Sequence, residues 1–100
     1  IHAKEGQVLI NTSRGPIVDT AALLAALRRG RPAMAGLDVF DNEPLPANDP
    51  LRDADLIEQG RLLLTPHLGY TTHATSTVFY QQTVASVRAY LAGAPIRVLV

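Results

Sequence analysis

The stretch Gly36-Leu37-Asp38-Val39-Phe40-Asp41-Asn42-Glu43-Pro44 ends an apolar run with carboxylates and a proline. The run, residues 33–40, is almost wholly apolar and short for a helix, so it predicts a buried strand of a parallel sheet. Asp38 is then expected near the carboxyl end of that strand, where open α/β sheets bind ligands. A turn-forming role at the same corner is an equally good interpretation of Asp38. Glu43 is expected in the following loop, with its backbone biased toward an extended conformation by Pro44.

Two further apolar runs predict strands, at residues 8–10 before this stretch and at residues 62–65 after it. A helix is predicted over residues 20–29, between the first two strands, with Asp19 as its N-cap and Gly30 just past its end. A strand, a helix and a second strand in this order cross over right-handedly into a parallel sheet. The three strands therefore share one sheet and one carboxyl edge.

The remaining segments also have helical patterns. A short helix is predicted over residues 51–57, with Asp49-Pro50 as its start. A long helix is predicted over residues 71–91, packed on the sheet, and an extended tail over residues 96–100. The expected fold class is α/β, a Rossmann-like doubly wound parallel sheet, present as a partial domain.

Composition limits the function classes. A chain of 100 residues with 47% hydrophobic and 18% charged residues is globular and not disordered. Nine basic and nine acidic residues cancel, so we expect neither a nucleic acid nor an anionic membrane as a partner. The absence of cysteine excludes disulfides and thiolate metal sites and is compatible with a cytoplasmic location. The three histidines lack His-Glu-x-x-His spacing, so no metal site is expected.

The strand ends deliver four charged or titratable groups to one edge of the sheet. Arg14 follows the first strand, Asp38 and Glu43 follow the second, and His67 follows the third. Reduction of a 2-oxo acid requires a guanidinium that holds the substrate carboxylate and a proton donor for the developing alkoxide. A carboxylate beside that donor would favour its charged form, and we expect Glu43 to do this for His67.

Each of these groups alone has another interpretation. His67 by itself is typical of a hydrogen-bonded loop histidine, and Arg14 is compatible with a surface ion pair. Ser13, His67 and Glu43 also have the residue types of a hydrolase triad. That alternative is disfavoured, because a nucleophile elbow needs glycine two residues before the serine, where this chain has Asn11.

Three ordered motifs carry a family resemblance, at residues 9–15 (LINTSRG), 36–44 (GLDVFDNEP) and 65–69 (TPHLG). With them the chain resembles the D-isomer-specific 2-hydroxyacid dehydrogenases, in the later part of their NAD-binding domain. The resemblance implies that Arg14 binds substrate, that His67 is the acid/base and that Glu43 is its partner. The cofactor-binding set that it implies is Thr12, Ser13, Arg14, Asp38, His67, Leu68, Gly69 and Tyr70.

The resemblance also implies what the chain lacks. The seven glycines contain no Gly-x-Gly-x-x-Gly spacing. Residues 1–100 are therefore expected to be the second half of a nucleotide-binding domain, without its glycine-rich turn and without the substrate domain. By itself this chain is expected to be inactive and to bind NAD(H) weakly.

When full length, such a protein is expected to transfer a hydride between NAD or NADP, with NAD favoured, and a D-2-hydroxy acid/2-oxo acid pair. The resemblance implies a homodimer. The alternative is a non-catalytic NAD(H)-sensing protein like the C-terminal binding protein co-repressors, which share this fold. Formate dehydrogenase, a further relative, has glutamine at the position of Glu43, so Glu43 favours 2-hydroxy acid chemistry.

Overall fold

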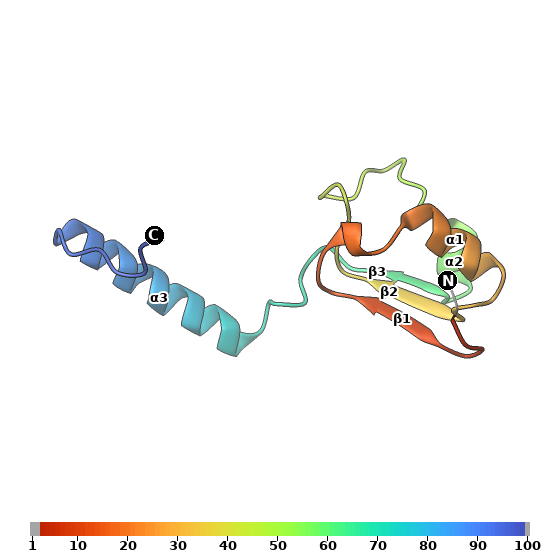
Figure 1. Ribbon diagram of the computed structural model, residues 1–100, viewed down its shortest axis with the longest axis horizontal. Coiled ribbons are helices and arrows are strands. Elements are labelled where there is room, and N and C mark those ends of the chain that lie inside the picture. The colour runs from red at the N-terminus through yellow and green to blue at the C-terminus, as the bar shows by residue number, and fades with distance from the viewer. Residues whose placement is uncertain (1–2, 100) are drawn as a thin grey trace. The chain divides into compact units, whose positions relative to one another are not determined.

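The computed structural model describes residues 3–99, which form two compact units that divide after Leu68 (Figure 1). The first unit contains β1 (Val8–Asn11), the 3-10 helix η1 (Gly15–Ile17), α1 (Thr20–Arg28), β2 (Met34–Leu37), α2 (Ala54–Glu58) and β3 (Leu62–Leu64). The second unit contains α3 (His73–Leu91). His2, which the sequence gives no functional role, and Val100, the last residue of the expected tail, lie outside the described residues.

The three strands form one parallel sheet in the order β1-β2-β3. In the register of this sheet, Asn11 pairs with Leu37, and Leu37 pairs with Leu64. The carboxyl ends of all three strands therefore lie at one edge, as the sequence predicts. The Rossmann-like α/β expectation is confirmed.

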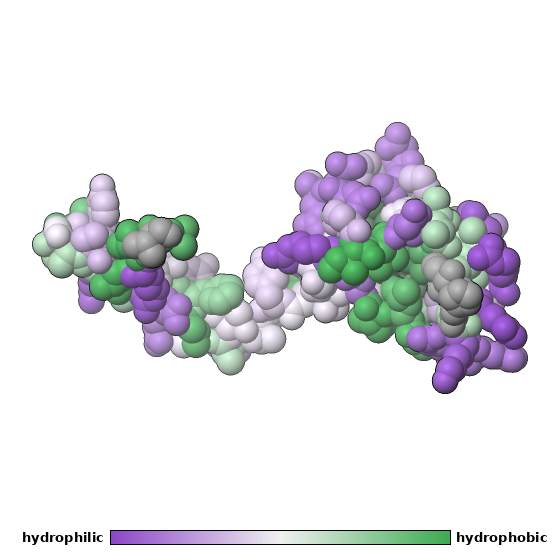
Figure 2. Space-filling model, in the orientation of Figure 1, coloured by the Kyte–Doolittle hydropathy of each residue, from purple (hydrophilic) through white to green (hydrophobic). Residues whose placement is uncertain are grey.

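Both α1 and α2 lie on the same side of the sheet in Figure 1. Side chains pointing to that side alternate with side chains pointing away, as expected for strands. The core that forms there consists of Leu23, Leu24, Leu27, Ala35, Leu37, Phe40, Leu51, Leu56 and Leu62. On the other face Val8, Ile10, Met34 and Leu63 are exposed. Figure 2 shows apolar residues in green where Figure 1 places β1.

The first helix begins and ends where the sequence indicates. The Asp19 side chain caps α1 by accepting a hydrogen bond from the Ala22 N–H at 2.8 Å. Gly30 follows the C-cap residue with a φ of +84°, a conformation that glycine adopts without steric cost. These local signals were sufficient to predict the helix to within one residue.

The expected start of the short second helix is wrong. It begins at Ala54, with Asp53 as its N-cap, and not at Asp49-Pro50. The Asp49 side chain instead accepts from the Leu51 N–H, two residues on, and so forms a turn. Besides capping α2, the Asp53 carboxylate forms an ion pair with Arg28 of α1, with 2.6 Å between Nη2 and Oδ2.

Two strands are shorter than their apolar runs. β2 ends at Leu37 and not at Phe40, and β3 ends at Leu64 and not at Thr65. The last bond between them runs from the Thr65 N–H to the Leu37 carbonyl at 3.0 Å. The next N–H that could face β2, that of His67, donates instead to the Thr65 carbonyl at 3.0 Å, so the pairing stops there. Residues 38–40 are nevertheless buried.

The second unit is a single long helix followed by a turn and a tail. The Thr72 side chain caps α3 by accepting from the Thr75 N–H, and Gly93 beyond the helix has a φ of +72°. The predicted helix is confirmed, and its expected packing on the sheet stays a prediction. Residues 96–99 form neither helix nor strand, and the predicted extended conformation is wrong at Arg97, where the backbone bends with a φ of +56°. No helix among the described residues is long and apolar enough to span a membrane.

Candidate active site

Three turns that follow the carboxyl ends of the strands form the candidate site. Residues 12–14 follow β1, residues 38–43 follow β2, and residues 65–68 follow β3. All three belong to the first unit. In a parallel α/β sheet this edge is the place where ligands bind.

His67 and Glu43 are in direct contact at the centre of this edge. The imidazole Nδ1 lies 2.5 Å from Glu43 Oε2, and both side chains are about two-thirds buried, with 36% and 34% of their surfaces exposed. The other carboxylate oxygen, Oε1, accepts from the Phe40 N–H at 3.0 Å. Contact with His67, and then the Phe40 N–H, lowers the pKa of Glu43 below its usual value of 4.5. Glu43 is therefore an ionised partner for His67 at neutral pH.

The turn that carries His67 has an unusual backbone. His67 has a φ of +53°, in the left-handed region that few residues other than glycine occupy, although asparagine, aspartate and histidine are found there more often than most. Asp38 holds this turn from both ends, because its Oδ1 accepts from Thr65 Oγ1 at 2.5 Å and from the Leu68 N–H at 3.0 Å. Asp38 is 5% exposed. The alternative interpretation places a turn former at the corner after its own strand; these two bonds instead show Asp38 stabilising the turn of another segment, after β3.

Arg14 stands at the start of η1 with an extended backbone, at a φ of −146° and a ψ of 144°. Its guanidinium Nη1 donates to the Ser13 carbonyl at 2.6 Å. The positive charge of Arg14 also contributes to the low pKa of Glu43, so the two residues share one electrostatic environment. The ion pairs found among residues 3–99 do not include Arg14, contrary to its alternative interpretation as a surface pair.

The turns after β1 and β2 touch through their main chains. A Cβ atom at Gly15 would lie 2.2 Å from the Phe40 carbonyl carbon and 2.5 Å from the Asp41 nitrogen. No side chain fits in that space, so glycine is required here by close approach and not by its backbone angles. The contact fixes the spacing between the Arg14 turn and the segment that holds Glu43.

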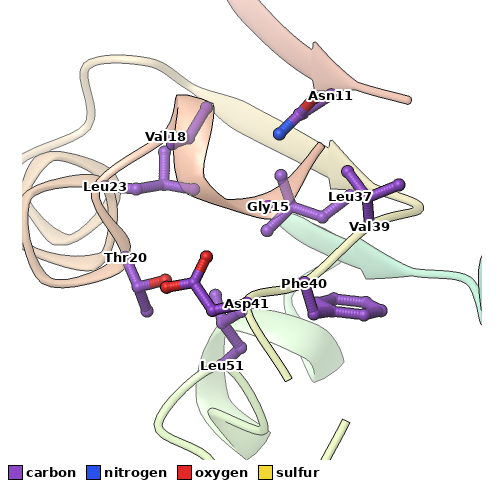
Figure 3. Close-up of a pocket in the computed structure, with 10 residues that line it drawn as sticks. All are labelled: Asn11, Gly15, Val18, Thr20, Leu23, Leu37, Val39, Phe40, Asp41 and Leu51. Atoms are coloured by element: carbon purple, nitrogen blue, oxygen red, sulfur yellow. The ribbon is translucent and has the colours of Figure 1, made fainter. Parts of the chain in front are cut away.

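A small cavity lies behind this contact (Figure 3). Its volume is about 10 Å³, and its lining includes Asn11, Val18, Leu23 and Val39. Such a volume holds about one water molecule. The cavity is therefore part of the packing beneath the site and not a binding place for a dinucleotide.

The structure brings together most of the residues that the sequence assigns to the site. Those in the first unit are Thr12, Ser13, Arg14, Asp38, Glu43, His67 and Leu68. Gly69 and Tyr70 belong to the second unit, and their expected place beside the cofactor stays a prediction.

Sequence reasoning missed Asn11 and Thr65, which hold the Arg14 turn and Asp38 respectively. The sequence did contain a signal for Asn11. It lies two residues after Leu9, whose side chain packs against the core, so the Asn11 side chain is expected on the same, buried side of the strand.

A parallel sheet with charged groups at its carboxyl edge defines a nucleotide-binding type of α/β domain. Comparison with known proteins makes this specific: the family described as D-isomer specific 2-hydroxyacid dehydrogenase, NAD binding domain, matches residues 2–69. The chain belongs to this family.

Individual relatives agree with that assignment. The chain is 41% identical over 90 residues to glyoxylate/hydroxypyruvate reductase B of Serratia proteamaculans, covering 90% of this chain and 26% of the relative. It is 44% identical to a D-isomer specific 2-hydroxyacid dehydrogenase of Xanthobacter autotrophicus solved with NADPH and MES, with a TM-score of 0.61 over 93% of this chain and 36% of that one. It is 34% identical to D-lactate dehydrogenase of Aquifex aeolicus solved with NAD and lactic acid, with a TM-score of 0.73 over 90% and 30% of the two chains. The chain thus spans about a quarter of the length of the curated relatives that it matches.

Proposed function

We propose that the protein containing this chain is an NAD(P)-dependent oxidoreductase that interconverts a D-2-hydroxy acid and its 2-oxo acid. The observation that carries the proposal is the 2.5 Å contact between His67 Nδ1 and Glu43 Oε2, at the edge where Arg14 also lies. The family membership of residues 2–69 supports it. We further propose that residues 1–100 supply the second half of the nucleotide-binding domain and that the glycine-rich turn lies elsewhere in the protein.

In the direction of reduction, His67 acts as the proton donor. Its Nδ1–H donates to ionised Glu43, which orients the ring and leaves the Nε2 proton for transfer to the substrate. That proton goes to the carbonyl oxygen as a hydride adds to C2, so the 2-oxo acid becomes a 2-hydroxy acid. Oxidation reverses both transfers, with neutral His67 accepting the hydroxyl proton.

Arg14 binds the carboxylate of the substrate. Its guanidinium is exposed at the edge of the sheet and presents a planar fork of N–H donors, which matches a carboxylate in a two-bond arrangement. The exposed Thr12 and Ser13 and the buried carboxylate of Asp38 offer polar partners that suit a nicotinamide carboxamide. The cofactor supplies the hydride when it is bound, and the protein supplies orientation and charge.

The names of the relatives suggest the first substrates to test, which are glyoxylate, hydroxypyruvate and pyruvate. NAD is the favoured cofactor, although relatives have been solved with NADPH and with NAD. The homodimeric state and the cytoplasmic location stay predictions.

The proposal is tested with the purified full-length protein, by following absorbance of NADH or NADPH at 340 nm with each 2-oxo acid. We expect turnover with at least one of these acids and, from hydroxypyruvate or pyruvate, a D-configured product, since the glycolate formed from glyoxylate is achiral. Tight NADH binding without turnover of any 2-oxo acid would contradict the proposal and favour the co-repressor alternative.

A further inference from the structure

Asn11 is buried at the end of β1, beneath the turn that carries Arg14. Among the described residues only Asn11 and Asp38 are polar or charged and buried, and each is 5% exposed. An amide is costly to bury unless its hydrogen bonds are made. The hydrogen bonds of the Asn11 side chain therefore indicate which segment of the chain it stabilises.

Both groups of the Asn11 amide bond to the next turn of the chain. The Oδ1 atom accepts from the Ser13 N–H at 3.1 Å, and the Nδ2 atom donates to the Arg14 carbonyl at 2.8 Å. Figure 3 shows the Asn11 side chain below the end of β1, facing the segment that enters η1. Two neighbouring residues of the turn are thus fixed by one side chain.

Among the hydrogen bonds of this turn, those to the Asn11 side chain are the ones that connect it to the end of β1. The Arg14 carbonyl also accepts from the Ile17 N–H, at the longer distance of 3.3 Å, and this bond belongs to η1 itself. Gly15 then presses against the Phe40 main chain and limits where the turn can move. The Arg14 backbone is consequently held between Asn11 on one side and Phe40 on the other.

We propose that Asn11 is a positioning residue for Arg14: it sets the backbone from which the guanidinium reaches the substrate carboxylate. This rests on the proposed function, in which Arg14 binds that carboxylate. A displacement of about 1 Å in a substrate-holding group can lower a rate by about 100-fold, so a fixed base for a long side chain matters.

A purely structural role for Asn11 predicts something different. If Asn11 only fills its buried position and ends β1, its replacement lowers stability without a selective effect on the substrate. Asn11→Asp separates the two roles, because aspartate keeps the size and the acceptor for the Ser13 N–H but loses the donor to the Arg14 carbonyl. Asn48→Asp is the matched control, since it makes the same chemical change at an exposed loop position.

The test is a double-mutant cycle in the full-length protein, with Asn11→Asp, Arg14→Ala and the double variant. With glyoxylate and saturating NADH, we expect Asn11→Asp to lower kcat/KM by about 10- to 100-fold, mostly through KM. In the Arg14→Ala background the same change should cost less than about threefold, because Asn11 then has no guanidinium to position. Asn48→Asp should leave kcat/KM within about twofold.

An equal loss with and without Arg14, or an unchanged KM in the Asn11→Asp variant, would overturn the assignment. A crystal structure of that variant gives a second readout that needs no activity: residues 12–14 should be displaced, and a turn in its original position would also overturn the assignment. A wild-type protein that reduces no 2-oxo acid would instead overturn the proposed function. In that case the crystal structure alone decides whether Asn11 fixes the Arg14 turn.

Discussion

The turn that carries Arg14 and the turn that carries His67 are held in opposite ways. The neutral amide of Asn11 stabilises the first turn through hydrogen bonds to Ser13 and Arg14, which are two and three residues further along the same segment. Asp38 and Glu43 hold the second from 24 to 30 residues away, with carboxylates. The Arg14 backbone is extended, whereas His67 is in the left-handed region. The side-chain support of the arginine turn thus comes from its own segment, although the Phe40 main chain also meets it at Gly15, whereas the side-chain support of the histidine turn comes from the segment after β2.

The largest effect on activity is expected from a substitution that removes the proton-donating imidazole of His67 but preserves the backbone of its turn. His67→Asn is the appropriate change, because asparagine tolerates the φ of +53° that alanine would strain. We expect kcat for 2-oxo acid reduction to fall by about 10²- to 10⁴-fold, the usual contribution of a general acid. Steady-state kinetics measure this, a circular dichroism spectrum like that of the wild type shows that the fold remains, and a crystal structure of the variant shows whether the turn does. A variant that retains most of its kcat would remove His67 from the chemistry.

Arg14→Lys tests the other turn without changing its charge. Lysine keeps the positive charge but loses the planar fork, so carboxylate binding should weaken. We expect KM for the 2-oxo acid to rise by about 10- to 100-fold, corresponding to about 1.5–3 kcal/mol for a charged hydrogen bond. The KM for NADH serves as the internal control. Kinetics equal to those of the wild type would place Arg14 outside the substrate site.

Thr65→Val tests the non-local support of the histidine turn. Valine has nearly the shape of threonine but cannot donate to Asp38 Oδ1. Loss of this bond should cost about 1 kcal/mol in the positioning of the turn, so we expect kcat to fall about fivefold. Thr65→Ser, which restores the hydroxyl, should recover most of the lost rate. If valine and serine have the same kcat, the hydroxyl does not support the turn.

The smallest effect concerns stability and pH. Contact with His67, and then with the Phe40 N–H, gives Glu43 a lower pKa in the folded protein than its usual 4.5. Ionised Glu43 therefore stabilises the fold above about pH 4.5, and this contribution is lost as the pH falls through the lowered value. Glu43→Gln should lower Tm at pH 7, and the difference from the wild type should shrink below pH 4.5. Thermal unfolding at several pH values measures it, and a constant difference would exclude the pairing as its source.

The same contrast between local and non-local turns explains what the sequence could predict. The first strand, the caps of α1 and the place of Arg14 depend on neighbouring residues, and the sequence predicted them nearly to the residue, whereas the predicted end of β2 was three residues too late. The predicted start of α2 was wrong because Asp49, which has the same local signal, forms a turn with Leu51, whereas Asp53 caps the helix and also pairs with Arg28, 25 residues away. The role of Asp38 in holding the histidine turn depends on the register of β2 and β3, so no local pattern contained it.

The contact between Gly15 and Phe40 has a consequence for how this edge can vary. Because two main chains meet there without room for a methyl group, the interval between Arg14 and Glu43 is independent of any nearby side chain. Substitutions around the edge can change its charge, its polarity or the substrates that it accepts, while this interval stays the same. Selection for a different substrate would therefore act on the residues that surround this contact, and the spacing of the two main-chain segments that carry Arg14 and Glu43 would be inherited unchanged.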